Sequence, residues 1–205
     1  MSELDTACAA GIALPREDCR SNTILAKLDR RLLSAEEAVT AILIAAIFLI
    51  LAINVILRSL GMPLIWADEA AILLMACAAF LGAAVALARG QHMAVTLLLD
   101  NLPQRLRFPV ILTVDVITLG FFLILSALCW RWFDPVNAFG AESLQAYSQQ
   151  TFNFIYQERT LTLGLNKVWF WLVLPLFAVL STIHALAALE RDVHHMRRHL
   201  KGNVQ

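Results

Sequence analysis

Four long apolar runs constrain this chain more than any other feature of its sequence. The first, residues 38–57, holds twenty consecutive residues without a charge. A helix of that length rises about 30 Å, which matches the hydrocarbon core of a bilayer. A soluble helical core would show polar stripes at helical spacing, and these runs have none. We therefore predict an all-α integral membrane protein with four transmembrane helices, at about 38–57, 68–88, 108–131 and 168–189.

The placement of the basic residues predicts how these helices are oriented. Hydrophobic residues make up 60% of the chain and charged residues only 16%, so the few charges are informative. Twelve of the 16 Lys and Arg residues precede the first run, lie between the second and third, or follow the fourth. The positive-inside rule then places both termini in the cytoplasm. The net charge is zero, so nothing in the composition indicates a nucleic acid partner.

Two segments on the predicted cytoplasmic side have an amphipathic pattern. In the N-terminal segment, 1–37, the apolar residues of 23–37 share one helical face and the basic residues lie elsewhere. This pattern predicts a helix at the membrane interface that leads into the first span. The connection after the second span has the same pattern over 91–107. We predict a second interfacial helix there.

The longest polar stretch is the connection between the third and fourth spans, residues 132–167, which this orientation places in the periplasm. Its aromatic residues fit two alternatives. They anchor a helix at the headgroup level, or they form a docking surface for a partner protein. These residues are Tyr147, Phe152, Phe154 and Tyr156. Beyond the fourth span, residues 190–205 form a basic cytoplasmic tail.

The second span is rich in small residues at four-residue spacing. Ala78, Gly82 and Ala86 form one such series, and Ala79 and Ala83 form another. Small residues at this spacing let helix backbones approach closely, whereas Leu or Ile would serve equally well against lipid. We predict that this span is buried against protein, either within the chain or in another subunit.

Few residues within or beside the spans could carry chemistry. Asp115 lies inside the third span, where an acid marks a functional site by default, yet a structural pair with Arg89 or Arg107 would also explain it. His92 and His184 raise the alternative of a haem b anchor for a redox enzyme, which needs two histidines facing each other inside the bundle. A small autonomous transporter is a third alternative, although paired broken helices are absent from the sequence. We predict no catalytic, cofactor or metal site.

An ordered set of short motifs crosses the first two spans and the connection that follows. The motifs are NVILR at 54–58, WADE at 66–69, FLGA at 80–83, RGQH at 89–92 and Leu-Pro at 102–103. Each alone has little specificity, but their order and spacing resemble the small, DctQ-like membrane subunit of the tripartite ATP-independent periplasmic (TRAP) transporters. The four-span plan with cytoplasmic termini agrees with this resemblance over most of the chain.

The resemblance implies a multi-pass, non-enzymatic subunit in the inner membrane of a bacterium. Such a subunit pairs with a large multi-span permease subunit that carries substrate and sodium by an elevator motion. A periplasmic substrate-binding protein delivers the substrate, an organic acid. The small subunit is then a fixed scaffold in contact with membrane lipids, and no cofactor is implied.

Two features depart from the family pattern. The family usually has an acid four residues after the histidine of RGQH, whereas this chain has Thr96. Any polar contact made by that acid is therefore missing here. The third connection is also longer than usual, so the resemblance says little about 131–167.

The charged residues around the first connection have both a local and a functional explanation. Arg58 ends the first span and Glu69 begins the second, and each charge suits the macrodipole of its helix. The alternatives are an ion pair between these two residues, or a contact of Glu69 with the large subunit. Trp66 is expected to anchor the interface, Gly82 to permit close packing and Asn54 to satisfy a hydrogen bond. The full set of expected structural or subunit-interface residues is Asn54, Arg58, Trp66, Glu69, Gly82, Arg89, His92 and Asp115.

Overall fold

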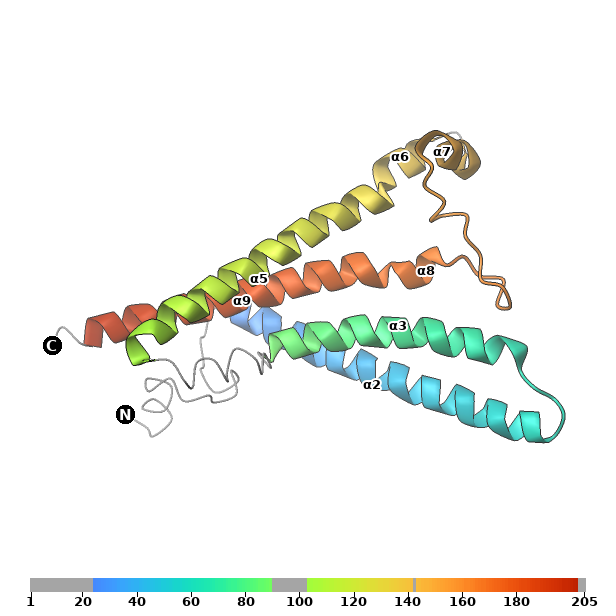
Figure 1. Cartoon of the computed structure of the whole chain (residues 1–205), viewed down its shortest axis with the longest axis horizontal. Coiled ribbons are helices and arrows are strands. Elements are labelled where there is room, and N and C mark those ends of the chain that lie inside the picture. The colour runs from blue at the N-terminus through green and yellow to red at the C-terminus, as the bar shows by residue number, and fades with distance from the viewer. Residues whose placement is uncertain (1–23, 90–102, 142, 203–205) are drawn as a thin grey trace. The chain divides into compact units, whose positions relative to one another are not determined.

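The computed structural model describes residues 24–89, 103–141 and 143–202, and helices dominate them (Figure 1). Four of these helices are long and apolar enough to cross a membrane, which confirms the predicted all-α membrane fold. These spans lie on α2 (Ile24–Ser59), α3 (Ile65–Ala88), α5 (Gln104–Phe133) and α9 (Val173–Gly202), and the third and fourth also take in the short helices next to α5 and α9. Three short helices lie between α5 and α9 in the sequence: α6 (Pro135–Gly140), α7 (Leu144–Thr151) and α8 (Val168–Trp171).

Helix α2 joins the predicted amphipathic segment and the predicted first span without a break. It has 36 residues, so at 1.5 Å per residue it is about 54 Å long, well beyond the roughly 30 Å of a hydrocarbon core. Its first turns carry exposed basic residues, among them Lys27 and Arg30. The interfacial position of these turns stays a prediction. The helix predicted over 91–107 falls mostly on 90–102, outside the described residues, and its last residues begin α5.

Helix α5 extends past the predicted end of the third span and stops at a proline. Pro135 disfavours right-handed helical geometry at the residue before it, and Asp134 adopts a left-handed conformation with φ of 37°. Aspartate is one of the few residues that tolerate this conformation. Pro135 then opens α6 at the position where a helix does not need the missing N–H. The connection therefore turns at a defined residue.

The fourth span is interrupted near its start and continues beyond its predicted end. Leu172 separates α8 from α9, and Pro175 cannot donate a backbone hydrogen bond to Trp171. Backbone bonds from Leu172 to Val168 and from Leu176 to Leu172 bridge the interruption. Helix α9 runs on to Gly202, so the start of the predicted basic tail at residue 190 is not a helix end.

The chain divides into two compact units, which are considered separately below. One unit contains the described parts of Met1–Ser34, Ala84–Ile124 and Val179–Gln205. The other contains Ala35–Ala83 and Leu125–Ala178. The second unit holds the turn between α2 and α3 and the whole connection between α5 and α9.

Candidate functional site

The turn between α2 and α3 is organised by a buried asparagine. Asn54 is 4% exposed, and its side-chain amide donates to Oδ1 of Asp68 at 3.2 Å. Its carbonyl oxygen accepts the backbone N–H of Leu64, just before α3, at 2.9 Å. The hydrogen bond expected for Asn54 is therefore made, and it joins the last turns of α2 to the start of α3.

Arg58 pairs with the first acid of WADE. A nitrogen of its guanidinium lies 3.6 Å from Oδ2 of Asp68, and both side chains are largely exposed. The structure does not make the alternative ion pair between Arg58 and Glu69. The next residue of a helix is rotated by about 100°, so Glu69 faces a different part of the chain.

Glu69 binds the end of the long connection, 92 to 94 residues later in the sequence. Its Oε1 accepts the backbone N–H of Leu161 at 2.8 Å. Its Oε2 accepts the backbone N–H groups of Thr162 at 2.7 Å and Leu163 at 3.3 Å, together with the Thr162 hydroxyl. One carboxylate thus ties the start of α3 to three consecutive residues of the connection.

The segment that Glu69 binds is itself closed into a tight loop, residues 160–165. The backbone N–H of Thr160 donates to the carbonyl of Leu165 at 2.8 Å, and the N–H of Leu165 donates to Thr160 Oγ1 at 2.9 Å. Gly164 has φ of 68°, a conformation that glycine adopts without strain. The loop presents Leu161 with its side chain 93% exposed.

The middle of the connection, just after α7, is held by polar bonds to the end of α5. The side-chain amide of Asn153 donates to the carbonyl of Trp132 at 2.6 Å, and its carbonyl oxygen accepts the N–H of Ile155 at 3.2 Å. The hydroxyl of Tyr156 donates to the carbonyl of Phe133. Backbone carbonyls at the end of α5 are thereby satisfied by side chains, as a helix terminus requires.

The four aromatic residues singled out in the connection divide into two buried or half-buried tyrosines and two exposed phenylalanines. Tyr147 is buried and Tyr156 is half-buried, with their rings 6.1 Å apart. Burial raises the pKa of Tyr156, and the nearby Tyr147 and Asp134 raise it further. Phe152 and Phe154 are exposed. The tyrosines therefore build the connection, while the phenylalanines remain available to lipid or to a partner.

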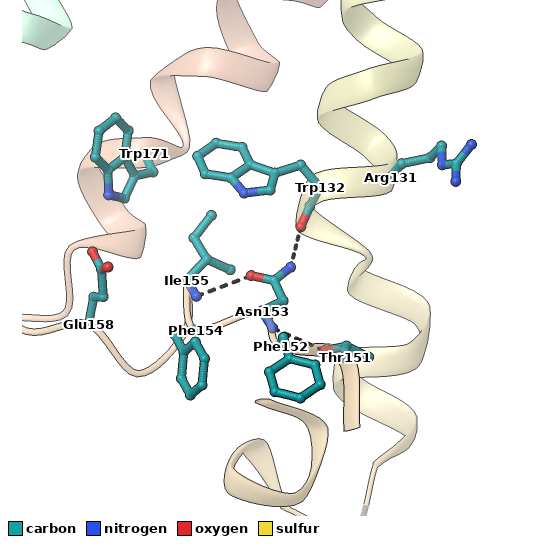
Figure 2. A pocket seen from close by; sticks show the side chains of 9 residues that line it. All are labelled: Arg131, Trp132, Thr151, Phe152, Asn153, Phe154, Ile155, Glu158 and Trp171. Atoms are coloured by element: carbon teal, nitrogen blue, oxygen red, sulfur yellow. Dashed lines mark hydrogen bonds between the residues drawn. The ribbon is translucent and has the colours of Figure 1, made fainter. Parts of the chain in front are cut away.

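A pocket lies beside this connection, at the end of α5. Figure 2 shows Trp132 and Trp171 along one side of it, Phe152 and Phe154 along the other, and Arg131 and Glu158 at opposite ends. The pocket has a volume of about 550 Å³. The rings of Trp132 and Trp171 meet edge to face, with centroids 6.0 Å apart. This contact joins the last turn of α5 to α8.

The other unit contains a buried polar cluster that the sequence did not reveal. His184 on α9 is 1% exposed, and its Nδ1 lies 2.6 Å from Oδ1 of Asp29 on α2. Arg191 lies 3.9 Å from the other oxygen of Asp29. Asp29 lies in the amphipathic segment, where an acid is expected to belong to the solvated face. The uncharged surroundings of His184 were the only signal that it needs a partner.

The remaining candidate residues are dispersed. Trp66 is partly exposed in the first turn of α3, and Arg89 directly follows the last turn. Asp115 is buried in α5, as an acid inside a span must be when it does not face lipid. His92 lies outside the described residues. No three residues of the metal-ligating types come together within the described parts of the chain.

The small residues of α3 fall on two different faces. A Cβ added at Gly82 would lie 4.0 Å from Cγ2 of Thr40, an ordinary contact, so packing against the described residues does not require glycine there. Ala79 and Ala83 are exposed, together with Ala76 one turn earlier. One small-residue face of α3 is therefore not covered by the described part of the chain.

Comparison with known proteins gives two findings. Residues 47–195, well over half of the chain, match a family described as "Tripartite ATP-independent periplasmic transporters, DctQ component". The chain is also 26% identical, over 152 residues, to a protein of Vibrio cholerae serotype O1 (strain ATCC 39315 / El Tor Inaba N16961). That protein is named "Sialic acid TRAP transporter small permease protein SiaQ". The match covers 74% of this chain and 77% of the relative.

Proposed function

Because this chain belongs to the DctQ family of TRAP transporter components, and so is a small permease subunit and not an enzyme, we propose that it is a fixed scaffold for a large permease subunit. A periplasmic binding protein completes the system, since the family name specifies three parts. The cargo is an organic acid, a class that includes the sialic acid in the name of the Vibrio cholerae relative. Uptake is coupled to sodium through an elevator motion of the large subunit, in the inner membrane of a bacterium.

The uncovered small-residue face of α3 is the observation that carries the scaffold role. Ala76, Ala79 and Ala83 are exposed at spacings of three and four residues, which place them on one face of the helix. Small residues at such spacing favour close helix packing inside membranes. Against lipid, an exposed alanine face would bring no gain in helix packing. We assign this face to contact with the large permease subunit.

Co-purification tests this assignment. Tagged chain is expressed with its large permease subunit and purified in mild detergent, and Ala79→Leu or Ala83→Leu is expected to lower the retained large subunit. The matched control is Ala45→Leu, which makes the same change at an exposed alanine of α2. Equal retention in all three variants would remove the α3 face from the interface. Failure of the wild-type chain to retain any large subunit would count against the scaffold itself.

A transport assay tests the wider proposal. The two membrane subunits are reconstituted in liposomes, and uptake of sialic acid is measured with the binding protein and an inward sodium gradient. The expected result is uptake that needs all three proteins and sodium. Uptake by the small subunit alone would instead favour an autonomous transporter. Family membership leaves no support for the haem b anchor.

A further inference from the structure

The pocket at the end of α5 combines charge and aromatic surface in a way that the scaffold role does not use. Its two ends carry opposite charges, at Arg131 and Glu158 (Figure 2). Glu158 already has a cation nearby, because Nζ of Lys167 lies 3.8 Å from its carboxylate. The guanidinium of Arg131 makes no hydrogen bond or ion pair with any residue that the structure describes. The pocket therefore has one positive charge that the described part of the chain does not neutralise.

The position of Arg131 in the helix explains its charge but not its unused hydrogen-bond donors. A cation in the last turn of α5 suits the helix macrodipole. That effect needs a charge but uses none of the five N–H donors of a guanidinium. A guanidinium is the side chain best suited to bind a phosphate, since its planar fork makes two parallel hydrogen bonds. The unused donors indicate an anionic ligand with several acceptor oxygens.

Tryptophans show the level of the membrane at which this cation lies. Trp130 and Trp132 at the end of α5, and Trp169 and Trp171 in α8, all have substantially exposed side chains. Tryptophan concentrates at the headgroup level of a bilayer. Arg131 lies between two of them in the sequence, so its guanidinium is at the level of the lipid phosphates. Leu128 lies one turn earlier in α5 and is exposed. It extends the apolar surface toward the hydrocarbon.

We propose that this pocket binds the phosphate group of a phospholipid from the leaflet at this end of the spans. Arg131 binds the phosphate, and Trp132, Trp171 and Phe152 contact the glycerol and upper acyl region. A free inorganic anion would use Arg131 but would leave the aromatic walls in contact with water. The lipid accounts for both the unneutralised charge and the exposed aromatic surface.

Lipid titration with native mass spectrometry tests the proposal. The chain is purified with its large subunit, delipidated in detergent, and titrated with phosphatidylethanolamine and, separately, with phosphatidylglycerol. Both lipids share the phosphate, so both are expected to bind the wild type. Arg131→Gln is expected to weaken the tightest binding step about tenfold, as for loss of a charged hydrogen bond. Arg131→Lys keeps the charge but loses the fork of paired N–H donors, so it is expected to bind more weakly than the wild type and more tightly than Arg131→Gln.

A matched control and a second probe can overturn the proposal. Arg159→Gln removes another exposed arginine of the same connection, outside the pocket, and is expected to leave binding unchanged. Unchanged binding in Arg131→Gln, or an equal loss in Arg159→Gln, would rule out this lipid site. Inorganic phosphate is titrated in parallel. If it binds as tightly as the lipids in an Arg131-dependent way, the pocket is a free anion site and the proposal fails.

Discussion

Nδ1 of His184 lies 2.6 Å from Oδ1 of Asp29, which connects α9 to α2 across 155 residues of sequence. Both side chains are almost fully buried, and Arg191 lies beside the second carboxylate oxygen. A buried polar group that loses a partner is costly, so each residue stabilises the other in this position. The pair therefore specifies how the first turns of α2 pack against α9.

Removing either member of this pair is expected to destabilise the chain strongly. Asp29→Ala leaves a buried imidazole, and the expected loss is about 3–5 kcal/mol in the free energy of unfolding. The double variant with His184→Ala is expected to lose less than the sum of the single variants, because the two residues interact directly. Reversible unfolding in detergent measures both quantities. His194→Ala, at an exposed histidine of the same helix, should change stability by no more than about 0.5 kcal/mol.

The 160–165 loop is expected to depend on Glu69. In Glu69→Ala the amides of Leu161, Thr162 and Leu163 lose their acceptor, and their hydrogen exchange with solvent should become severalfold faster. Hydrogen-exchange mass spectrometry on the connection measures this. Asp68→Asn changes the adjacent acid, which bonds to Asn54 and Arg58 instead, and should leave exchange in the loop unchanged. Equal protection in Glu69→Ala and wild type would show that other contacts hold the loop.

Two polar residues of the α2–α3 turn are expected to differ in importance. Asn54→Ala leaves the N–H of Leu64 without its acceptor at a part-buried position, and the expected loss is about 1–2 kcal/mol. Arg58→Ala removes an exposed ion pair and should cost no more than about 1 kcal/mol. Thermal unfolding of the two variants side by side gives the comparison. A larger effect for Arg58 would mean that its charge is used outside this chain.

The raised pKa of Tyr156 predicts that the chain loses stability at alkaline pH. Its pKa is raised in the folded chain, by burial first and then by Tyr147 and Asp134. The folded state therefore holds the phenolic proton more tightly than the unfolded state, whose tyrosine pKa is about 10. The contribution to stability is complete below that pH and is lost as pH rises through the folded pKa. The chain has only two tyrosines, so the difference in ultraviolet titration between wild type and Tyr156→Phe isolates this group. Titration of Tyr156 at or below the ordinary pKa would contradict the prediction.

The spans could be predicted because a bilayer imposes its own length scale on a helix. The runs 38–57 and 68–88 lie within α2 and α3 as the structure shows them. Helix ends were less predictable. Helix α9 continues through the basic residues after 189, and α5 continues to the residue before Asp134. In both places, charge marks the limit of the hydrocarbon and says nothing about where helical backbone stops.

Long-range contacts account for what sequence reasoning missed. Asn54 could be assigned a hydrogen bond because an amide in an apolar run needs one. The partner of Glu69 could not be identified, because it lies in the part of the chain that the family resemblance describes least. The same holds for Asp29, whose partner is on the last helix. Backbone N–H groups are present at every residue except proline, so no residue type signals that a segment will bind a carboxylate.

The four hydrogen bonds accepted by Glu69 limit what this acid can do in a transporter. A carboxylate has about four lone-pair positions, two on each oxygen. Oε2 accepts the N–H groups of Thr162 and Leu163 and the Thr162 hydroxyl, whereas Oε1 accepts only the N–H of Leu161. A cationic group bound at Oε2 would have to displace bonds that hold the 160–165 loop against α3. Glu69 therefore uses most of its acceptor capacity on a fold contact within its own chain.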